Sequence, residues 1–275
     1  SIASQMMKLL PILILFITCQ EPKSSEKQPV VNEWDKEGWA LVWNDEFDGP
    51  ALNLEKWSYE IGGHGWGNNE LQYYSDDDST AFILDGKLVI RAALVPQGTG
   101  SSDNLRYFSS ARLRTSGKGD WRYGRIEVKA KLALGQGIWP AIWMLPTDWM
   151  YGGWPESGEI DIMEQLFENF EMVQCAVHTP DTHGDKTIVQ QVNVTDVTEN
   201  FHVYGLEWTA DKLKFFVDGL NLIETKRIEN EAGRFTLIFL AARDDHETAY
   251  KYMAPLIELT YNWDPEAVSY THLRA

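Results

Sequence analysis

Residues 159–164 read EIDIME, so three carboxylates are interleaved with apolar side chains within six positions. Side chains of a β-strand alternate between its two faces, so Glu159 and Asp161 share one face and the isoleucines between them point into a core. Glu164 is out of step by one position. We predict a β-bulge at residues 162–163 that returns Glu164 to the face of the other two acids. Such a costly group of like charges is most common at functional sites.

Composition limits the kinds of protein that this chain can be. Its 275 residues, of which 44% are hydrophobic, fit one all-β domain or two small domains. The 12 Trp, 11 Tyr and 11 Phe indicate either a large core or an aromatic carbohydrate-binding cleft. The formal net charge of −17 argues against nucleic acid and anionic membrane surfaces as partners. It also disfavours a polyanionic substrate such as a sulfated polysaccharide.

Short strand-like runs recur along the chain with turn signals between them. Asp85-Gly86 predicts a hairpin turn, and Asp218-Gly219 predicts another. No long segment shows a 3.6-residue period, and there is no internal repeat, so the fold class is all-β, an antiparallel sandwich or barrel. The expected strands are residues 39–43, 82–84, 87–92, 107–115, 124–132, 138–144, 158–165, 173–178, 188–194, 202–209, 212–217 and 235–241.

Residues 1–19 are interpreted as upstream residues followed by a lipoprotein-type signal peptide. An apolar run at 9–17 follows Lys8 and is too short to span a bilayer. Thr18 then precedes Cys19, which a bacterial lipoprotein would carry lipidated; an ordinary secretory signal or an uncleaved anchor are the alternatives. Cys175 has no disulfide partner in this interpretation and is expected to be a small buried residue.

The chain after Cys19 divides into a tether and a domain. Residues 20–33 are rich in Pro, Ser, Lys and Glu without periodicity, which predicts a flexible tether. Residues 34–265 are predicted to form the folded domain. This organisation predicts a secreted monomer at the outer membrane or cell surface of a bacterium, attached to the membrane only through its lipid.

Paired carboxylates are the chemistry of glycoside hydrolysis. One carboxyl group attacks the sugar or activates water, and the other protonates the leaving oxygen. With the bulge, Glu159 and Glu164 lie about 13 Å apart at Cα, and their side chains can lean together over a twisted sheet. The charge of Asp161 between them raises the pKa of a neighbour, so that one glutamate stays protonated while the other ionises.

GEIDIME at residues 158–164 resembles the active-site signature of glycoside hydrolase family 16, in the bulged form found in laminarinases and related β-1,3-glucanases. Further matches cover residues 39–239. They are WNDEFDG at 43–49, GWGNNELQYY at 65–74, SSAR at 109–112, YGRIE at 123–127 and GIWPAIWMLP at 137–146.

The resemblance implies a β-jelly-roll sandwich with a carbohydrate-binding cleft on its concave sheet. It implies retaining endo-hydrolysis of β-1,3-glucan, with Glu159 as nucleophile, Asp161 as its assisting residue and Glu164 as general acid/base. It implies that no organic cofactor is required. A structural calcium ion is common in the family, and Glu46 and Gly86 occupy the matching positions; oxygen ligands suit calcium.

Five further residues are candidates for substrate binding, each with a structural alternative. Trp139 and Trp143 share one strand face and would stack on sugars, or else pack in the core. Asn68 and Arg112 can donate to sugar hydroxyls, or else serve a turn and a surface ion pair. His178 matches a histidine beside the catalytic strand and would contact substrate or the general acid, or else be a satisfied core histidine.

The C-terminal end departs from the family pattern from about residue 243. The usual closing strand is not recognisable, and residues 255–261 are the only candidate for it. Two rival functions stay open. The same machinery could act on mixed-linkage β-1,3-1,4-glucan, agar or another galactan. Alternatively, the chain could be a non-catalytic glucan-binding surface lipoprotein, although its three acids argue against this.

Overall fold

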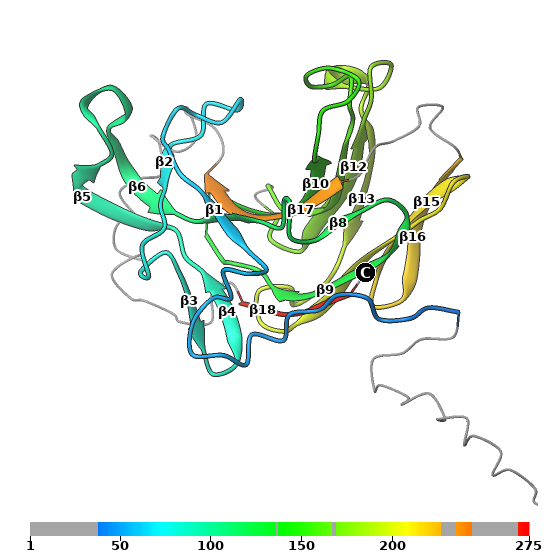
Figure 1. Ribbon diagram of the computed structural model, residues 1–275, viewed down its shortest axis with the longest axis horizontal. Coiled ribbons are helices and arrows are strands. Elements are labelled where there is room, and N and C mark those ends of the chain that lie inside the picture. Colours follow the sequence, from blue (N-terminus) through cyan, green and yellow to red (C-terminus); the bar gives the residue numbers. More distant parts are fainter. Residues whose placement is uncertain (1–37, 136, 167–168, 227–234, 244–268, 275) are drawn as a thin grey trace, which may run out of the picture. The chain divides into compact units, whose positions relative to one another are not determined.

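The computed structural model describes residues 38–135, 137–166, 169–226, 235–243 and 269–274, and these form strands, turns and two short 3₁₀ helices (Figure 1). The 3₁₀ helices are Ser102–Asn104 and Gly184–Lys186. Across these ranges no helix is long and apolar enough to cross a membrane. The predicted signal peptide, the tether and Cys19 lie outside the described residues.

The strands form two large antiparallel sheets and one small sheet. The first sheet has the order β1 (Ser58–Glu60), β7 (Arg112–Arg114), β17 (Phe235–Arg243), β10 (Ile138–Pro146), β11 (Glu159–Glu164), β12 (Met172–His178) and β13 (Ile188–Asn193), with β8 (Asp120–Trp121) paired to β17. The second has the order β16 (Leu220–Lys226), β15 (Lys212–Val217), β14 (His202–Trp208), β9 (Gly124–Lys131), β18 (Ser269–Arg274), β4 (Lys87–Ile90) and β3 (Ala81–Leu84).

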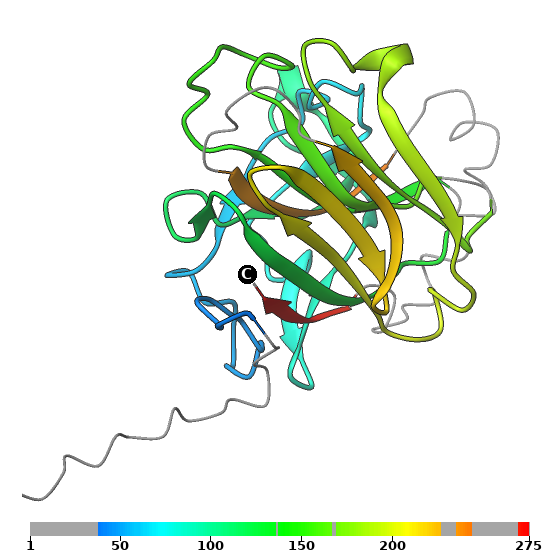
Figure 2. The ribbon, with the colours of Figure 1, turned by 90° about the vertical axis from the view of Figure 1, so that its right-hand side faces the viewer.

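The yellow ribbons of β14, β15 and β16 lie side by side in Figure 2, as their antiparallel pairing requires. The small sheet has the order β2 (Gln72–Tyr74), β6 (Arg106–Ser110) and β5 (Ala93–Thr99). Its β2–β6 pair is parallel. The bridge between Gly62 and Tyr74 ties the loop before β2 to this sheet.

The two large sheets pack face to face through one apolar core. Ile142 of β10 and Ile160 of β11, both at most 4% exposed, belong to the same cluster as Tyr204 and Leu206 of β14. This packing confirms the predicted antiparallel sandwich. Because alternate residues of β10 and β11 are buried here, the residues between them point away from this core. Cys175 is buried and free, as expected.

Most predicted strands are confirmed within a few residues, including the hairpin of β3 and β4 around Asp85-Gly86. The strand expected at 39–43 is wrong, because only Trp39 makes a β-bridge there. The strand expected at 107–115 is two strands, β6 and β7, which end and begin on either side of Ala111 and join different sheets.

The predicted position of the closing strand is also corrected by the structure. β18 at Ser269–Arg274 lies between β9 and β4 and pairs with both, so a strand near the end of the chain joins the two parts of the second sheet. The register shifts between Tyr270 and His272, and such a bulge breaks the two-residue alternation by which a strand is recognised in sequence. The earlier candidate, residues 255–261, lies outside the described residues.

Candidate active site

β11 carries the bulge that the sequence predicted. It lies between Asp161 and Glu164, where the register of β11 shifts against both β10 and β12. Ile162 is the extra residue, and its side chain is 4% exposed and belongs to the core. The bulge turns Glu164 to the same side as Glu159 and Asp161, and all three acids line one cavity.

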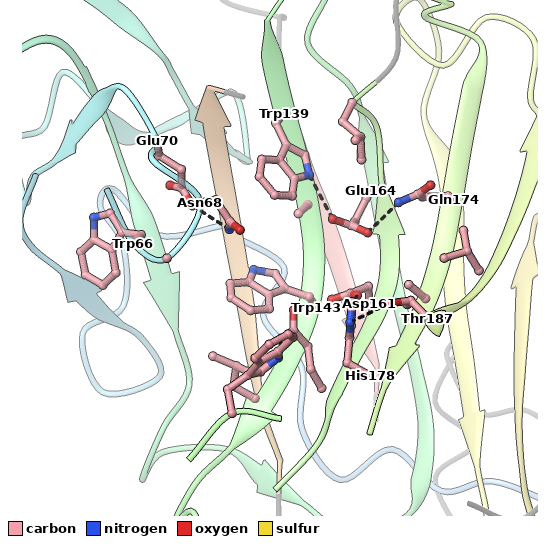
Figure 3. A pocket seen from close by; sticks show the side chains of 18 of the residues that line it. Trp66, Asn68, Glu70, Trp139, Trp143, Asp161, Glu164, Gln174, His178 and Thr187 are labelled. Carbon is pink, nitrogen blue, oxygen red and sulfur yellow. Dashed lines mark hydrogen bonds and ion pairs between the residues drawn. The ribbon is translucent and has the colours of Figure 1, made fainter. Parts of the chain in front are cut away.

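The cavity has a volume of about 590 Å³ and opens on the face of the first sheet that is turned away from the core (Figure 3). β10 to β13 form its floor, and loops around residues 66–70, 149–154 and 184–187 add to its wall. Its lining includes Trp66, Asn68, Glu70, Arg112, Trp139, Trp143, Trp154, Glu159, Asp161, Glu164, Gln174, His178, Thr187 and Val189.

Asp161 is at the centre of a hydrogen-bonded chain. His178 Nε2 lies 3.0 Å from Asp161 Oδ2, and His178 Nδ1 lies 3.4 Å from the hydroxyl of Thr187. The side chains of Asp161 and Glu159 are hydrogen-bonded to each other. Glu159 also accepts a hydrogen bond of 2.7 Å from the indole Nε1 of Trp154. One end of this chain is therefore the carboxyl group predicted to be the nucleophile.

Glu164 has separate partners. Its Oε1 accepts a hydrogen bond of 3.1 Å from Trp139 Nε1, and its Oε2 accepts one of 3.1 Å from Gln174 Nε2 (Figure 3). Both donors come from the strands that flank β11. The two glutamates therefore lie on one strand face but in different hydrogen-bonded environments, as a division of labour between two carboxyl groups requires.

Burial raises the pKa of all three acids. It is the main cause for Glu159, whose pKa lies well above its usual value and is raised further by the charge of Asp161. It is also the main cause for Asp161, whose pKa the charge of Glu164 raises in addition. Burial raises the pKa of Glu164 to about 7, against the lowering effect of its hydrogen bond from Gln174. The cluster therefore keeps protons near neutral pH.

Arg112 supports one wall of the cavity. Its guanidinium carbon lies 4.7 Å from the ring centroids of both Trp66 and Trp143, so the cation is placed between two indoles. The same side chain is 6% exposed and forms an ion pair with Glu60, which also pairs with Arg114 at 2.7 Å. The predicted alternative of an exposed surface pair is wrong, because this ion pair is largely buried.

The other predicted binding residues also line the cavity. Trp139 and Trp143 face it from β10 instead of packing in the main core, and they contact a small cluster built on Tyr74. Asn68 serves the predicted turn, since its backbone N–H closes on Gly65, and its side chain lines the cavity, so its binding role stays a prediction. His178 makes its hydrogen bonds with Asp161 and Thr187, not with Glu164.

Several cavity residues were missed by the sequence reasoning. Trp154 is 47% exposed and touches the predicted nucleophile, and its position five residues before Glu159 was the available signal. Gln174 lies opposite Glu164 in the β11–β12 register, which the bulge shifts and the sequence alone does not fix. Trp66 and Glu70 were within the quoted motif at 65–74 but were not assigned a role.

Two sets of residues were considered as metal ligands. Ligand atoms of Glu159, Asp161 and His178 all lie within 4.8 Å of one another, which is the spacing of the hydrogen-bonded chain itself. For the predicted calcium site, Glu46 accepts a hydrogen bond of 3.2 Å from Asn44, and Gly86 lies in the β3–β4 turn with φ of 69°. One carboxylate and one turn are few ligands for an ion that takes six to eight oxygens, and the calcium site stays a prediction.

Comparison with known proteins places this geometry in a family. Residues 65–239 match the family model described as "Glycosyl hydrolases family 16". The chain is 45% identical over 187 residues to "Beta-glucanase" of Rhodothermus marinus, across 66% of this chain and 63% of that protein. It is 40% identical over 184 residues to "Glucan endo-1,3-beta-glucosidase" of Cryptopygus antarcticus, across 66% of this chain and 67% of that protein.

Comparison with a solved structure supports the same family. The laminarinase from Rhodothermus marinus superposes with a TM-score of 0.72 and 34% sequence identity, covering 86% of this chain and 96% of that one. The fold predicted from the sequence, an antiparallel β-jelly-roll sandwich, is thereby confirmed. The match to the family model covers well over half of the chain and includes the bulged strand with its three acids. The chain belongs to glycoside hydrolase family 16.

Proposed function

We propose that this chain is a retaining endo-β-1,3-glucanase of laminarinase type that works by double displacement. One observation carries the proposal. Glu159 and Glu164 point into a single cavity from one bulged strand, each with its own set of hydrogen-bond donors. Retaining glycosidases need two such carboxyl groups, one to attack and one to transfer the proton.

In the first step Glu159 attacks the anomeric carbon, and Glu164 protonates the leaving glycosidic oxygen. The bond from sugar to leaving group breaks as the bond from sugar to Glu159 forms. A pKa of about 7 suits Glu164 for this role, because it holds a proton at neutral pH and releases it easily. In the second step the ionised Glu164 takes a proton from water, and the water releases the sugar from Glu159 with its β configuration restored.

Asp161 and its partners would keep the nucleophile Glu159 ionised and oriented. Asp161 is 2% exposed and so more deeply buried than Glu159, and its charge is the more costly one. The hydrogen bond between the pair raises the pKa of Glu159 and lowers that of Asp161, which by itself favours the proton on Glu159. We assign the shared proton to Asp161 because that carboxyl group is the more deeply buried, and Asp161 then donates to Glu159. His178 Nε2 lies 3.0 Å from Asp161 Oδ2, and His178 Nδ1–H donates to the Thr187 hydroxyl, whose own hydrogen is donated to the carbonyl of Gly184 at 2.7 Å. With the N–H of Trp154, the ionised Glu159 accepts two hydrogen bonds before it attacks.

The substrate class follows from the wall of the cavity and from the relatives. Trp66, Trp139, Trp143 and Trp154 all line the cavity, and an aromatic lining of this kind suits the stacking of sugar rings. The matched relatives are named as a beta-glucanase and as a glucan endo-1,3-beta-glucosidase, which supports a neutral glucan with β-1,3 linkages. Mixed-linkage β-1,3-1,4-glucan is the nearest alternative, and agar or another galactan is a further one.

The secreted, lipid-anchored location belongs to the same proposal. It is supported only by the apolar run at 9–17 and by Thr18 before Cys19. Mass spectrometry of the chain purified from membranes of the host cell would test it. A diacylglyceryl group on Cys19 supports the anchor, and an unmodified Cys19 overturns it.

Reducing-sugar release from laminarin tests the function. The wild-type chain is compared with Glu159→Gln and, as a matched control, with the same change at the exposed Glu55. We expect activity on laminarin that the first variant loses and the second keeps. Lichenan and agarose in parallel separate the substrate alternatives. Folded wild-type protein that binds laminarin without releasing reducing ends would instead identify a non-catalytic glucan-binding protein.

A further inference from the structure

Glu70 is a buried acid that the proposed reaction does not use. It is 2% exposed, and three side chains donate hydrogen bonds to it. Gln72 Nε2 and Tyr74 Oη both donate to its Oε2, at 2.6 and 2.9 Å. Asn68 Nδ2 donates to its other oxygen, Oε1, at 3.3 Å. A buried carboxyl group with this many donors is costly to form, and its position beside the cavity calls for an explanation.

The loop that Glu70 ends has an unusual backbone. Gly65, Trp66, Gly67 and Asn69 all have φ between 50° and 89°, in the left-handed region that side chains other than glycine rarely adopt. The backbone N–H of Glu70 closes this loop on the carbonyl of Gly65 at 3.1 Å. A strained loop persists where surrounding contacts hold it, and Glu70 supplies both backbone and side-chain contacts.

Glu70 also decides which way the amide of Asn68 can point. An ionised carboxyl group only accepts hydrogen bonds, so the atom of Asn68 that faces it must be Nδ2. Burial raises the pKa of Glu70, whereas its hydrogen bonds and the nearby charge of Arg112 lower it and favour the ionised form. Figure 3 shows the Asn68 amide reaching from Glu70 toward the tryptophans of β10.

We propose that Glu70 is a positioning residue that fixes the Asn68 amide with Oδ1 toward the cavity, where it accepts a hydrogen bond from a free sugar hydroxyl. This inference rests on the proposed function, and it gives Asn68 the role of an acceptor instead of the donor expected from the sequence. An acceptor selects a hydroxyl group that still has its hydrogen, and it disfavours an ether or a sulfate ester at that position.

The change Glu70→Gln reverses the amide and leaves the shape nearly unchanged. Gln72 and Tyr74 both donate to one oxygen of Glu70, so the oxygen of the new glutamine takes that place. Its NH₂ group then faces Asn68, whose amide must turn over and present Nδ2 to the cavity. We expect KM for laminarihexaose to rise about tenfold or more, with kcat within about threefold, because a lost hydrogen bond in the bound state costs affinity.

A double-mutant cycle separates positioning from a general structural role. Asn68→Ala should raise KM by a similar factor, and Glu70→Gln added to it should change KM by less than about twofold, because Glu70 acts through Asn68. The exposed Glu55→Gln serves as the matched control and should leave KM unchanged. Multiplying effects in the double variant, or an unchanged KM in Glu70→Gln, would overturn the proposal.

A neutron structure provides a test that does not depend on Glu70→Gln folding. It uses the Glu159→Gln variant with bound laminarihexaose, in which deuterium positions on Asn68 are visible. Deuterons of Nδ2 directed at Glu70, with Oδ1 facing a sugar hydroxyl, support the proposal, and the reverse orientation overturns it. Wild-type protein that neither binds nor cleaves laminarihexaose would overturn the proposed function itself. An active enzyme in which the effects of Glu70→Gln and Asn68→Ala on KM are independent would overturn only the positioning role of Glu70.

Discussion

Replacing Glu164 with glutamine should change how the stability of the fold depends on pH. Burial raises the pKa of Glu164 from 4.5 to about 7. A raised pKa means that folding favours the protonated acid. The stability associated with this group is therefore fully present below about pH 4.5 and is lost as the pH rises through about 7. Glutamine does not ionise, so the variant should not show this loss.

The size of the effect follows from the shift. At 1.36 kcal/mol per pKa unit, the change from 4.5 to about 7 corresponds to at most about 3 kcal/mol. The substitution also has a cost. Trp139 and Gln174 both donate to Glu164, and a glutamine has only one oxygen to accept them, so one hydrogen bond worth about 1 kcal/mol is lost. We expect the variant to be about 2 kcal/mol more stable than wild type at pH 8 and about 1 kcal/mol less stable at pH 4.5.

Urea unfolding at pH 4.5, 6 and 8 measures this directly, with the free energy of unfolding extrapolated to zero urea. The control is Glu55→Gln, an exposed change of the same kind that should follow wild type at every pH. The reasoning fails if the unfolding free energies of wild type and Glu164→Gln run parallel between pH 4.5 and 8. It also fails if the unfolding free energy of the variant minus that of wild type is lower at pH 8 than at pH 4.5.

Three further substitutions test single contacts of the site. Trp154→Phe removes the hydrogen bond to Glu159 from a side chain that is 47% exposed, so kcat should fall about tenfold while Tm moves by less than about 2 °C. His178→Ala leaves the buried Asp161 without that partner, and stopped assays on laminarin should show kcat reduced by about tenfold or more. Arg112→Met breaks a largely buried ion pair on β7 and should lower the unfolding free energy by about 2 kcal/mol or more, measured by urea unfolding. An unchanged value in any of these assays contradicts the contact concerned.

The catalytic strand was predictable because its pattern is local. Alternation placed Glu159 and Asp161 on one face, and the odd spacing to Glu164 required the bulge that the structure contains. Most strands of the core were found because each is a short local run of apolar residues between turn signals, as in the β3–β4 hairpin. β18 was missed because its bulge interrupts that alternation, and the split at Ala111 was missed because a continuous run of residues serves two sheets.

The partners in the cavity depend on contacts between distant segments, which a single sequence does not reveal. Arg112 lies between Trp66 and Trp143, which come from a loop and from β10, and nothing near Arg112 in the chain indicates this. Trp154 reaches Glu159 from the loop before β11. Asn68 was predicted to donate to a sugar hydroxyl, and the sequence did not reveal that its Nδ2 donates to the buried Glu70.

The stereochemistry of azide rescue is the measurement that tests the central claim most directly. Glu159→Ala and Glu164→Ala are each supplied with sodium azide and an aryl β-laminaribioside, and the glycosyl azide formed is identified by NMR. The account predicts an α-azide from Glu159→Ala, because azide replaces the nucleophile, and a β-azide from Glu164→Ala, because azide replaces the activated water. The opposite pairing of product and variant would contradict the roles assigned to the two glutamates.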